Sequence, residues 1–139
     1  MEHLAILSKE KKLLEKIICG EKTIESRWYT HKKTPYHKIK PGEVIYFKES
    51  GKPVTVKAKV SQTLFFDELN KEKIKSIIQE YGVKICITQE YSSKLECKNY
   101  CTLIFLENIQ KIEPFNINKR GYGNMAAWIT VESINQIKK

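Results

Sequence analysis

The sequence predicts an α+β fold in which a small, mostly antiparallel β-barrel carries two or three flanking helices. Five or six strand-like segments share the 139 residues with two helix-like segments. The strands are not regularly separated by helices, which argues against a doubly wound parallel sheet. No internal repeat or linker divides the chain, so we expect a single domain over residues 1–139.

The N-terminal part predicts a strand, a helix and a second strand. Residues 3–7 form a short apolar run, and Ser8 then fits the N-cap of a helix over about residues 9–19. Apolar residues at i, i+3 and i+4 give this helix a buried face, and Gly20 is placed to take the left-handed conformation that ends a helix. Residues 23–29 then alternate as a strand.

The middle of the chain predicts a hairpin followed by a helix. The strand at residues 43–48 and the alternating strand at residues 54–60 flank a turn that contains Gly and Pro. A second amphipathic helix follows over residues 67–82, with Gly82 as its stop. Residues 83–98 give no clear prediction.

The C-terminal part predicts a buried strand over residues 102–106, which continues extended over residues 108–114 and ends at a proline, and a final strand over residues 126–131. Between this extended stretch and the final strand lies a polar loop, residues 116–122, rich in turn-forming residues. This loop either closes over a ligand or is a cluster of β-turns. We expect the tail to form a short helical turn.

Charge is the strongest bulk signal. The chain has 25 Lys and Arg against 16 Asp and Glu, a net charge of +9, and residues 1–40 hold ten of these cations and five of the anions. Such a field favours nucleic acid, a nucleotide or an anionic membrane surface, unless the lysines merely solvate the surface. No apolar run is long enough to span a bilayer and no signal peptide is evident, so we expect a cytoplasmic protein without membrane contact.

The cysteines give no sign of a metal site. Cys19, Cys86, Cys97 and Cys101 fit neither a C-x-x-C motif nor a paired zinc framework. We expect reduced thiols, buried at Cys19 and Cys86, with no metal and no cofactor.

The stretch of residues 20–29 gives the strongest sign of a functional site. Lys22, Glu25 and Arg27 lie close together in sequence, and alternation places Glu25 and Arg27 on one face of the predicted strand. A charged face is unusual for a half-buried strand and indicates a ligand site. The alternative is a surface salt-bridge ladder that contributes little to stability.

Further candidates for ligand contact lie around this strand. Aromatic side chains can stack on an unpaired base, although Trp28 can equally pack in the core. Trp128 stands in an apolar run, and we expect it in the core. The lysines of the basic loop at residues 30–40 fit phosphate contacts. The candidates outside the charged stretch are Tyr29, Lys48, Ser50, Asn118, Lys119 and Tyr122.

The spacing Gly20-x-Lys22-x-x-Glu25-x-Arg27 resembles the G-x-K-x-x-E-x-R signature of the ASCH domain. It stands in the expected context of strand, helix, glycine and strand. The Pro-Gly-Glu turn that leads into the hydrophobic strand at residues 44–47 resembles the next element of that family. The resemblance covers most of residues 3–66 and implies a PUA-like β-barrel.

The same resemblance implies that RNA, a nucleotide or a nucleoside binds in a basic cleft lined by the signature. Lys22 and Arg27 would contact phosphate or base, and Glu25 would accept hydrogen bonds from a base or hold Arg27. Some relatives are amidohydrolases of N4-acetylcytidine and ribonuclease activity has been attributed to the family, so Lys22 and Glu25 are the catalytic candidates. Where the amidohydrolase branch carries its threonine, this chain carries Glu25, and Thr23 stands elsewhere in the motif. Binding and hydrolysis stay open alternatives, and no protein partner is identified.

Overall fold

The structure is a computed structural model that describes residues 1–123 and 125–139; Asn124, which follows the predicted polar loop, lies outside the described residues. In chain order its elements are β1 (Glu2–Leu7), α1 (Leu13–Ile18), β2 (Ile24–Tyr29), β3 (Val44–Glu49), β4 (Val54–Phe66), α2 (Lys71–Ile85), the 3₁₀ helix η1 (Gln89–Leu95), β5 (Tyr100–Phe115), β6 (Trp128–Val131) and the 3₁₀ helix η2 (Ile134–Gln136).

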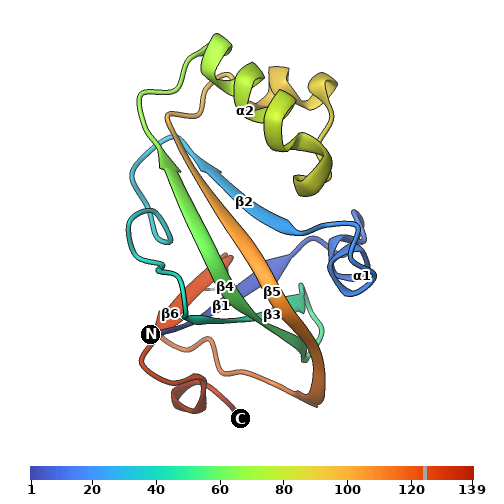
Figure 1. Ribbon diagram of the computed structural model, residues 1–139. Helices are drawn as coiled ribbons and strands as arrows, with labels where there is room; N and C mark the ends of the chain where they lie inside the picture. The colour runs from blue at the N-terminus through green and yellow to red at the C-terminus, as the bar shows by residue number, and fades with distance from the viewer. Residues whose placement is uncertain (124) are drawn as a thin grey trace.

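The six strands form one curled sheet in the order β2-β5-β4-β3-β1-β6 (Figure 1). β1 runs parallel to β3, and the other neighbours are antiparallel. The long strands β4 and β5 pair with three register shifts. Each such bulge bends the strand and increases its twist, so the long hairpin curls the sheet into a partial barrel. The predicted mostly antiparallel barrel with flanking helices is confirmed.

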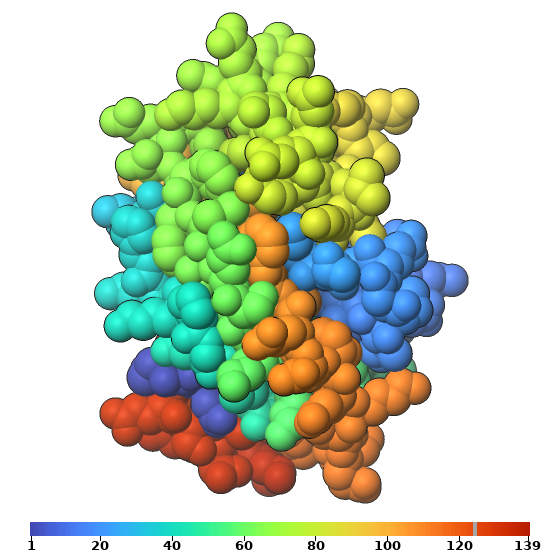
Figure 2. All heavy atoms as spheres, viewed as in Figure 1, coloured from blue at the N-terminus to red at the C-terminus, as the bar shows by residue number. Residues whose placement is uncertain are grey.

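The helices cover different parts of the sheet. Leu14 and Ile17 of α1 pack into the barrel core with Phe47 of β3. Ile74 of α2 packs with Leu103 of β5 in a second core cluster. In Figure 2, the α1 region and the cyan segment before β3 lie on opposite sides of β4 and β5. Each fully buried aliphatic side chain contributes about 1.5–3 kcal/mol by leaving water.

The two ends of the curled sheet approach each other without a backbone ladder between them. β2 is the edge strand at one end and β6 is the edge strand at the other. Arg27 of β2 donates hydrogen bonds to the carbonyls of Ile6 in β1 and of Ala127, just before β6. We call the gap that this side chain crosses the seam.

The start of α1 differs from the prediction. The helix begins at Leu13, and its N-cap is Lys12 in the left-handed conformation with φ 55°. Ser8 does not cap it, because its hydroxyl donates to the Glu10 carboxylate at 3.1 Å. The predicted left-handed glycine after the helix is confirmed, since Gly20 has φ +85°.

The end of α2 also differs. The helix runs through Gly82 to Ile85, and Cys86 takes the left-handed cap position with φ 69°. A Cβ on Gly82 would lie 2.9 Å from the carbonyl oxygen of Ile87. The glycine therefore permits a close approach of the chain after the helix and does not stop the helix.

The strand predicted at residues 102–106 and its extended continuation over residues 108–114 form one strand, β5. Asn108 has φ 51° where the pairing with β4 shifts between Lys57 and Lys59, so the apparent break is a bulge. The last strand begins at Trp128, two residues later than predicted. The helical turn expected in the tail is η2.

All four cysteines are free thiols. Cys101 is buried and Cys86 is half-buried, whereas Cys19 is exposed. The predicted burial of Cys19 is wrong because this residue caps α1 at its solvent end. No helix among the described residues is both long enough and apolar enough to cross a membrane.

Candidate functional site

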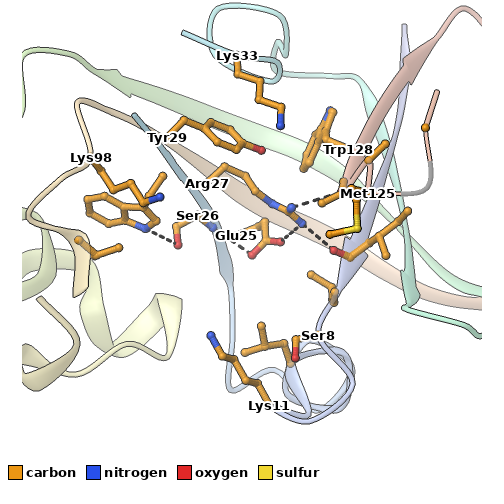
Figure 3. A pocket seen from close by; sticks show the side chains of 18 of the residues that line it. Ser8, Lys11, Glu25, Ser26, Arg27, Tyr29, Lys33, Lys98, Met125 and Trp128 are labelled. Carbon is orange, nitrogen blue, oxygen red and sulfur yellow. Dashed lines mark hydrogen bonds and ion pairs between the residues drawn. The ribbon is translucent and has the colours of Figure 1, made fainter. Parts of the chain in front are cut away.

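A cavity of about 670 Å³ lies in the seam (Figure 3). Residues 25–29 of β2 form one wall, and residues 6–8 and 125–128 form the facing wall. The cavity is open because β2 has no neighbouring strand on this side. We call it the seam cavity.

Arg27 spans this cavity. Its guanidinium donates to the carbonyls of Ile6 and Ala127, both at 3.3 Å, and to Oε2 of Glu25 at 3.0 Å. It also lies over the Trp128 ring, 5.2 Å from the ring centre. Among the described residues, its buried Nε has no hydrogen-bond partner. Because the planar guanidinium fork joins both ends of the sheet, Arg27 fixes the width of the cavity.

Lys22 and Glu25 form a buried pair next to Arg27. Their exposed fractions are 2% and 3%. The Lys22 ammonium donates to the carbonyls of Ile24 and Ile85, both at 2.8 Å, and lies 3.2 Å from Oε1 of Glu25. These three acceptors match the three donors of an ammonium group. Lys22 therefore ties the start of β2 to the end of α2.

The charges of this group are fixed by its contacts. Burial raises the pKa of Glu25, but the charges and hydrogen bonds of Lys22 and Arg27 outweigh it, so the pKa lies below its usual value. The Ser26 N–H also donates to this carboxylate at 3.1 Å. For Tyr29, burial raises the pKa more than the Arg27 charge lowers it. The wall thus presents a neutral phenol beside a trio whose net charge is +1 at neutral pH.

Aromatic rings at the cavity carry cations over their faces. The Lys33 ammonium lies 5.3 Å from the centre of the Tyr29 ring, and the Lys11 ammonium lies 5.1 Å from the centre of the Tyr91 ring. Both distances are within the range of about 6 Å for cation–π attraction. Lys11, Lys33 and Lys98 reach towards the cavity from three different segments (Figure 3).

A buried histidine fixes the ring of Trp128. Nε2 of the fully buried His3 lies 2.7 Å from Oε1 of Glu43, and Nδ1 lies 3.0 Å from Oγ1 of Thr130 and 3.3 Å from Nε1 of Trp128. An ionised carboxylate can only accept, so Nε2 carries the proton towards Glu43 and Nδ1 of the neutral ring is an acceptor. The Trp128 N–H lies within reach of this Nδ1 and also of Oγ1 of Thr130, at 3.2 Å. Burial lowers the pKa of His3 more than Glu43 raises it, which agrees with a neutral ring.

The sequence and the structure were compared with known proteins, and solved structures of similar fold were found. No protein-family model matches the sequence, and no curated protein matches it. The ASCH protein of Zymomonas mobilis matches with a TM-score of 0.70 at 18% identity, over 97% of this chain and 91% of that one. A point mutant of it matches with a TM-score of 0.72 at 17% identity, over 97% and 93%. The N-terminal domain of Staphylothermus marinus McrB matches with a TM-score of 0.56 at 10% identity, over 97% and 90%.

The chain has the ASCH-domain fold. The likeness extends over nearly the full length of both chains, and it confirms the PUA-like α+β barrel that the signature implied. Of the four residues Gly20, Lys22, Glu25 and Arg27, the last two line the seam cavity, where β2 leaves its outer edge unpaired.

The predicted ligand-contact residues fall into three groups. Those that line the seam cavity are Glu25, Arg27, Tyr29 and Tyr122. Lys22 lines a neighbouring cavity together with Glu25. Those outside both linings are Lys48, Ser50, Asn118 and Lys119. Two of this last group support the wall, since Lys119 donates to the carbonyl of Ala126 and the Ser50 N–H donates to the carbonyl of Leu7, both at 3.0 Å.

The neighbouring cavity, which we call the side cavity, has a volume of about 430 Å³. It lies between α1 and the end of α2, and the residues that line it but not the seam cavity are Lys16, Lys22 and residues 85–88.

In residues 1–123 and 125–139, no group of three His, Cys, Asp or Glu side chains lies together as a metal site.

Sequence reasoning missed Tyr91 and Lys98, because residues 83–98 gave no prediction. Both residues reach the cavity only because α2 and η1 pack beside β2. The two tryptophans are packed against the core and also line the cavity. Trp128 is 9% exposed and Trp28 packs beside the α2 core cluster, yet both line the seam cavity.

Proposed function

We propose that this chain is an ASCH-family protein that binds RNA or a nucleotide-type ligand in the seam cavity. The observation that carries the proposal is the meeting of cations and aromatic faces at the open edge of β2. Arg27, Lys33 and Lys98 supply positive charge, and Tyr29 and Trp128 supply ring faces. The ASCH protein of Zymomonas mobilis, with the same fold, supports the family assignment.

Phosphate attraction is the first step of the proposed binding. The net charge of +9 draws a polyanion towards the protein, and the rim lysines Lys33 and Lys98 lie where a backbone phosphate can be held. Contacts of this kind position a nucleic acid without selecting its sequence.

Base binding is the second step. Unpaired RNA bases stack on aromatic faces and on guanidinium planes. In the seam cavity the Tyr29 ring is covered by the exposed Lys33, so a base can take the ring face while the lysine moves to a phosphate. Arg27 is held by two carbonyls and Glu25, and therefore offers a fixed charge rather than a mobile one.

The alternative of a hydrolase gives catalytic roles to Lys22 and Glu25. The contacts of both residues favour a supporting role. Lys22 has its donors occupied by two carbonyls and a carboxylate, and Glu25 accepts from Lys22, Arg27 and Ser26. We expect no turnover of N4-acetylcytidine or single-stranded RNA by the wild-type protein. Turnover that a Lys22→Met substitution abolishes in a folded protein would favour the hydrolase.

A salt titration tests the binding proposal. Fluorescence anisotropy of a labelled single-stranded RNA should show log affinity falling with log salt by about 0.7 for each phosphate contact. Lys33→Gln and Lys98→Gln should each weaken binding and lower that slope by about one contact. The control Lys52→Gln, exposed and outside both cavities, should change neither. Weak binding at low salt with no salt dependence would contradict the proposal.

A further inference from the structure

We propose that the seam cavity and the side cavity together bind two consecutive nucleotides of a single-stranded RNA, one in each cavity, with the linking phosphate at Lys11. This inference rests on the proposed function. It specifies the ligand of the proposed function, RNA or a nucleotide, as two linked nucleotides of a single strand.

The two cavities are adjoining parts of one trough. They share the lining residues Lys11, Leu13, Glu25, Ser26, Trp28 and Tyr91. Their volumes, about 670 Å³ and about 430 Å³, each lie within the range of about 300–1,000 Å³ typical of small-molecule sites. Each cavity therefore has room for one nucleotide-sized group, and a ligand can pass from one to the other.

The cations are spread along this trough. Lys33 and Lys98 line only the seam cavity, Lys16 lines only the side cavity, and Lys11 lines both. A phosphodiester that links the two groups crosses the boundary, where the exposed Lys11 lies over the Tyr91 ring. Transfer of the Lys11 ammonium from the ring to the phosphate would leave Lys94, 5.6 Å from the ring centre, as the cation over Tyr91.

The unpaired edge of β2 runs along the boundary. Thr23 and Tyr29 direct their carbonyls to the β5 side, where they accept from Leu106 and Asn99. Backbone groups of a strand alternate between its two sides, so the even-numbered residues face the seam. Of these, the Ile24 carbonyl is bound by Lys22.

The backbone groups left for a ligand on this edge include an acceptor and a donor that lie next to each other. Among the described residues, no partner is found for the Ser26 carbonyl or the Trp28 N–H, and both residues line both cavities. An adjacent acceptor and donor match the hydrogen-bonding edge of a nucleobase, which also offers donors beside acceptors.

The walls of the side cavity suit a planar base. Leu13, Trp28 and Ile87 supply apolar surface, while Lys16 supplies the charge for a phosphate. The Trp28 ring is fixed because its Nε1 donates to Oγ of Ser26 at 3.0 Å. A fixed ring loses little conformational freedom when a base stacks on it.

Calorimetry with short RNAs tests this inference. The probes are the 5′-phosphorylated mononucleotides of the four bases, the matching dinucleotides and trinucleotides, and a longer single-stranded RNA, all at one salt concentration. For the preferred base, the dinucleotide should bind at least about tenfold more tightly than the mononucleotide, and a third nucleotide should add less. Lys16→Gln should weaken the dinucleotide about threefold or more and leave the mononucleotide unchanged. Lys98→Gln should weaken both, and the control Lys9→Gln, exposed and outside both linings, should weaken neither.

A natural thiol reports on the side cavity. Cys86 is half-buried and lines only that cavity, whereas Cys97 is exposed and lines neither. The dinucleotide should slow alkylation of Cys86 by a maleimide and leave Cys97 unchanged, and the mononucleotide should slow neither.

The outcomes separate the two proposals. Equal affinity for mononucleotide and dinucleotide, or unprotected Cys86, would overturn the two-nucleotide inference and leave the proposed function intact. An absence of binding for all mononucleotides, dinucleotides and longer single-stranded RNA would overturn both.

Discussion

At Arg27 a single side chain joins the two ends of the sheet. Its guanidinium holds a carbonyl on β1, a carbonyl before β6 and the Glu25 carboxylate on its own strand. A lysine at this position would place one compact ammonium where three separate acceptors now lie. The same guanidinium therefore sets the shape of the cavity and holds the two ends of the curled sheet together.

Arg27→Lys should lower the free energy of unfolding by about 1–3 kcal/mol, because acceptors in the seam lose their charged donor. The same change should weaken RNA binding, since the width of the cavity is no longer fixed. Urea unfolding and anisotropy measure the two effects. Arg120→Lys is the control, because Arg120 is exposed, and it should change stability by less than about 0.5 kcal/mol. Equal behaviour of the two variants would refute the role given to Arg27.

At the scale of the element, a glycine inside α2 makes room for the chain segment that follows the helix. Gly82 lies inside the helix, where Gly ordinarily costs about 1 kcal/mol relative to Ala. Here its missing Cβ lets the chain after the helix fold back, so that the Ile87 N–H donates to the Gly82 carbonyl at 2.8 Å. This return places residues 85–88 on the side cavity.

Gly82→Ala should therefore destabilise the protein, against the usual helix preference. The new methyl group would lie 2.9 Å from the Ile87 carbonyl oxygen and 3.1 Å from Cγ2 of Ile78. We expect a loss of about 1–3 kcal/mol in thermal or urea unfolding. Ser76→Ala, at an exposed position of the same helix, should give a small gain. A gain in stability for both variants would show that the contact of the new methyl group with the Ile87 carbonyl oxygen carries no cost.

At the scale of the whole molecule, the buried His3 makes stability depend on pH. In the unfolded chain His3 takes up a proton near its ordinary pKa of 6.5, but the folded chain holds this pKa lower. Below about pH 6.5 the unfolded state therefore binds more protons, and the free energy of unfolding falls as the pH falls. Protonation of Nδ1 would also leave Oγ1 of Thr130, at 3.2 Å, as the remaining acceptor of the Trp128 indole.

Urea unfolding from pH 7.5 to pH 3.5 should show two losses of stability. The first, below about pH 6.5, comes from His3, and the second, below about pH 4.5, comes from Glu25 and Glu43, whose pKa values are also lowered in the fold. His3→Gln should remove the first loss and keep the second. His31→Gln, at an exposed position, should keep both. If the loss of stability below about pH 6.5 persists in His3→Gln, a group other than His3 causes it.

Local sequence patterns were enough to predict one wall of the site. Alternation and the spacing from Gly20 to Arg27 place the charged residues of β2 correctly, and turn signals give the hairpin. The facing wall comes from Ile6 and Ala127, which are brought to β2 only by the curl of the sheet. Bulges such as that at Asn108 produce this curl and leave little sign in one sequence.

The unpaired edge of β2 would be a hazard in most sheets. Free N–H and C=O groups along a strand invite a strand from another molecule, and such pairing leads to aggregation. Here the edge faces a cavity whose rim includes Lys11, Lys33, Tyr91 and Lys98. A base can enter this space singly, whereas an incoming strand would have to displace the rim along its whole length. Substitutions that open the rim should therefore make the protein prone to self-association as well as poor at binding.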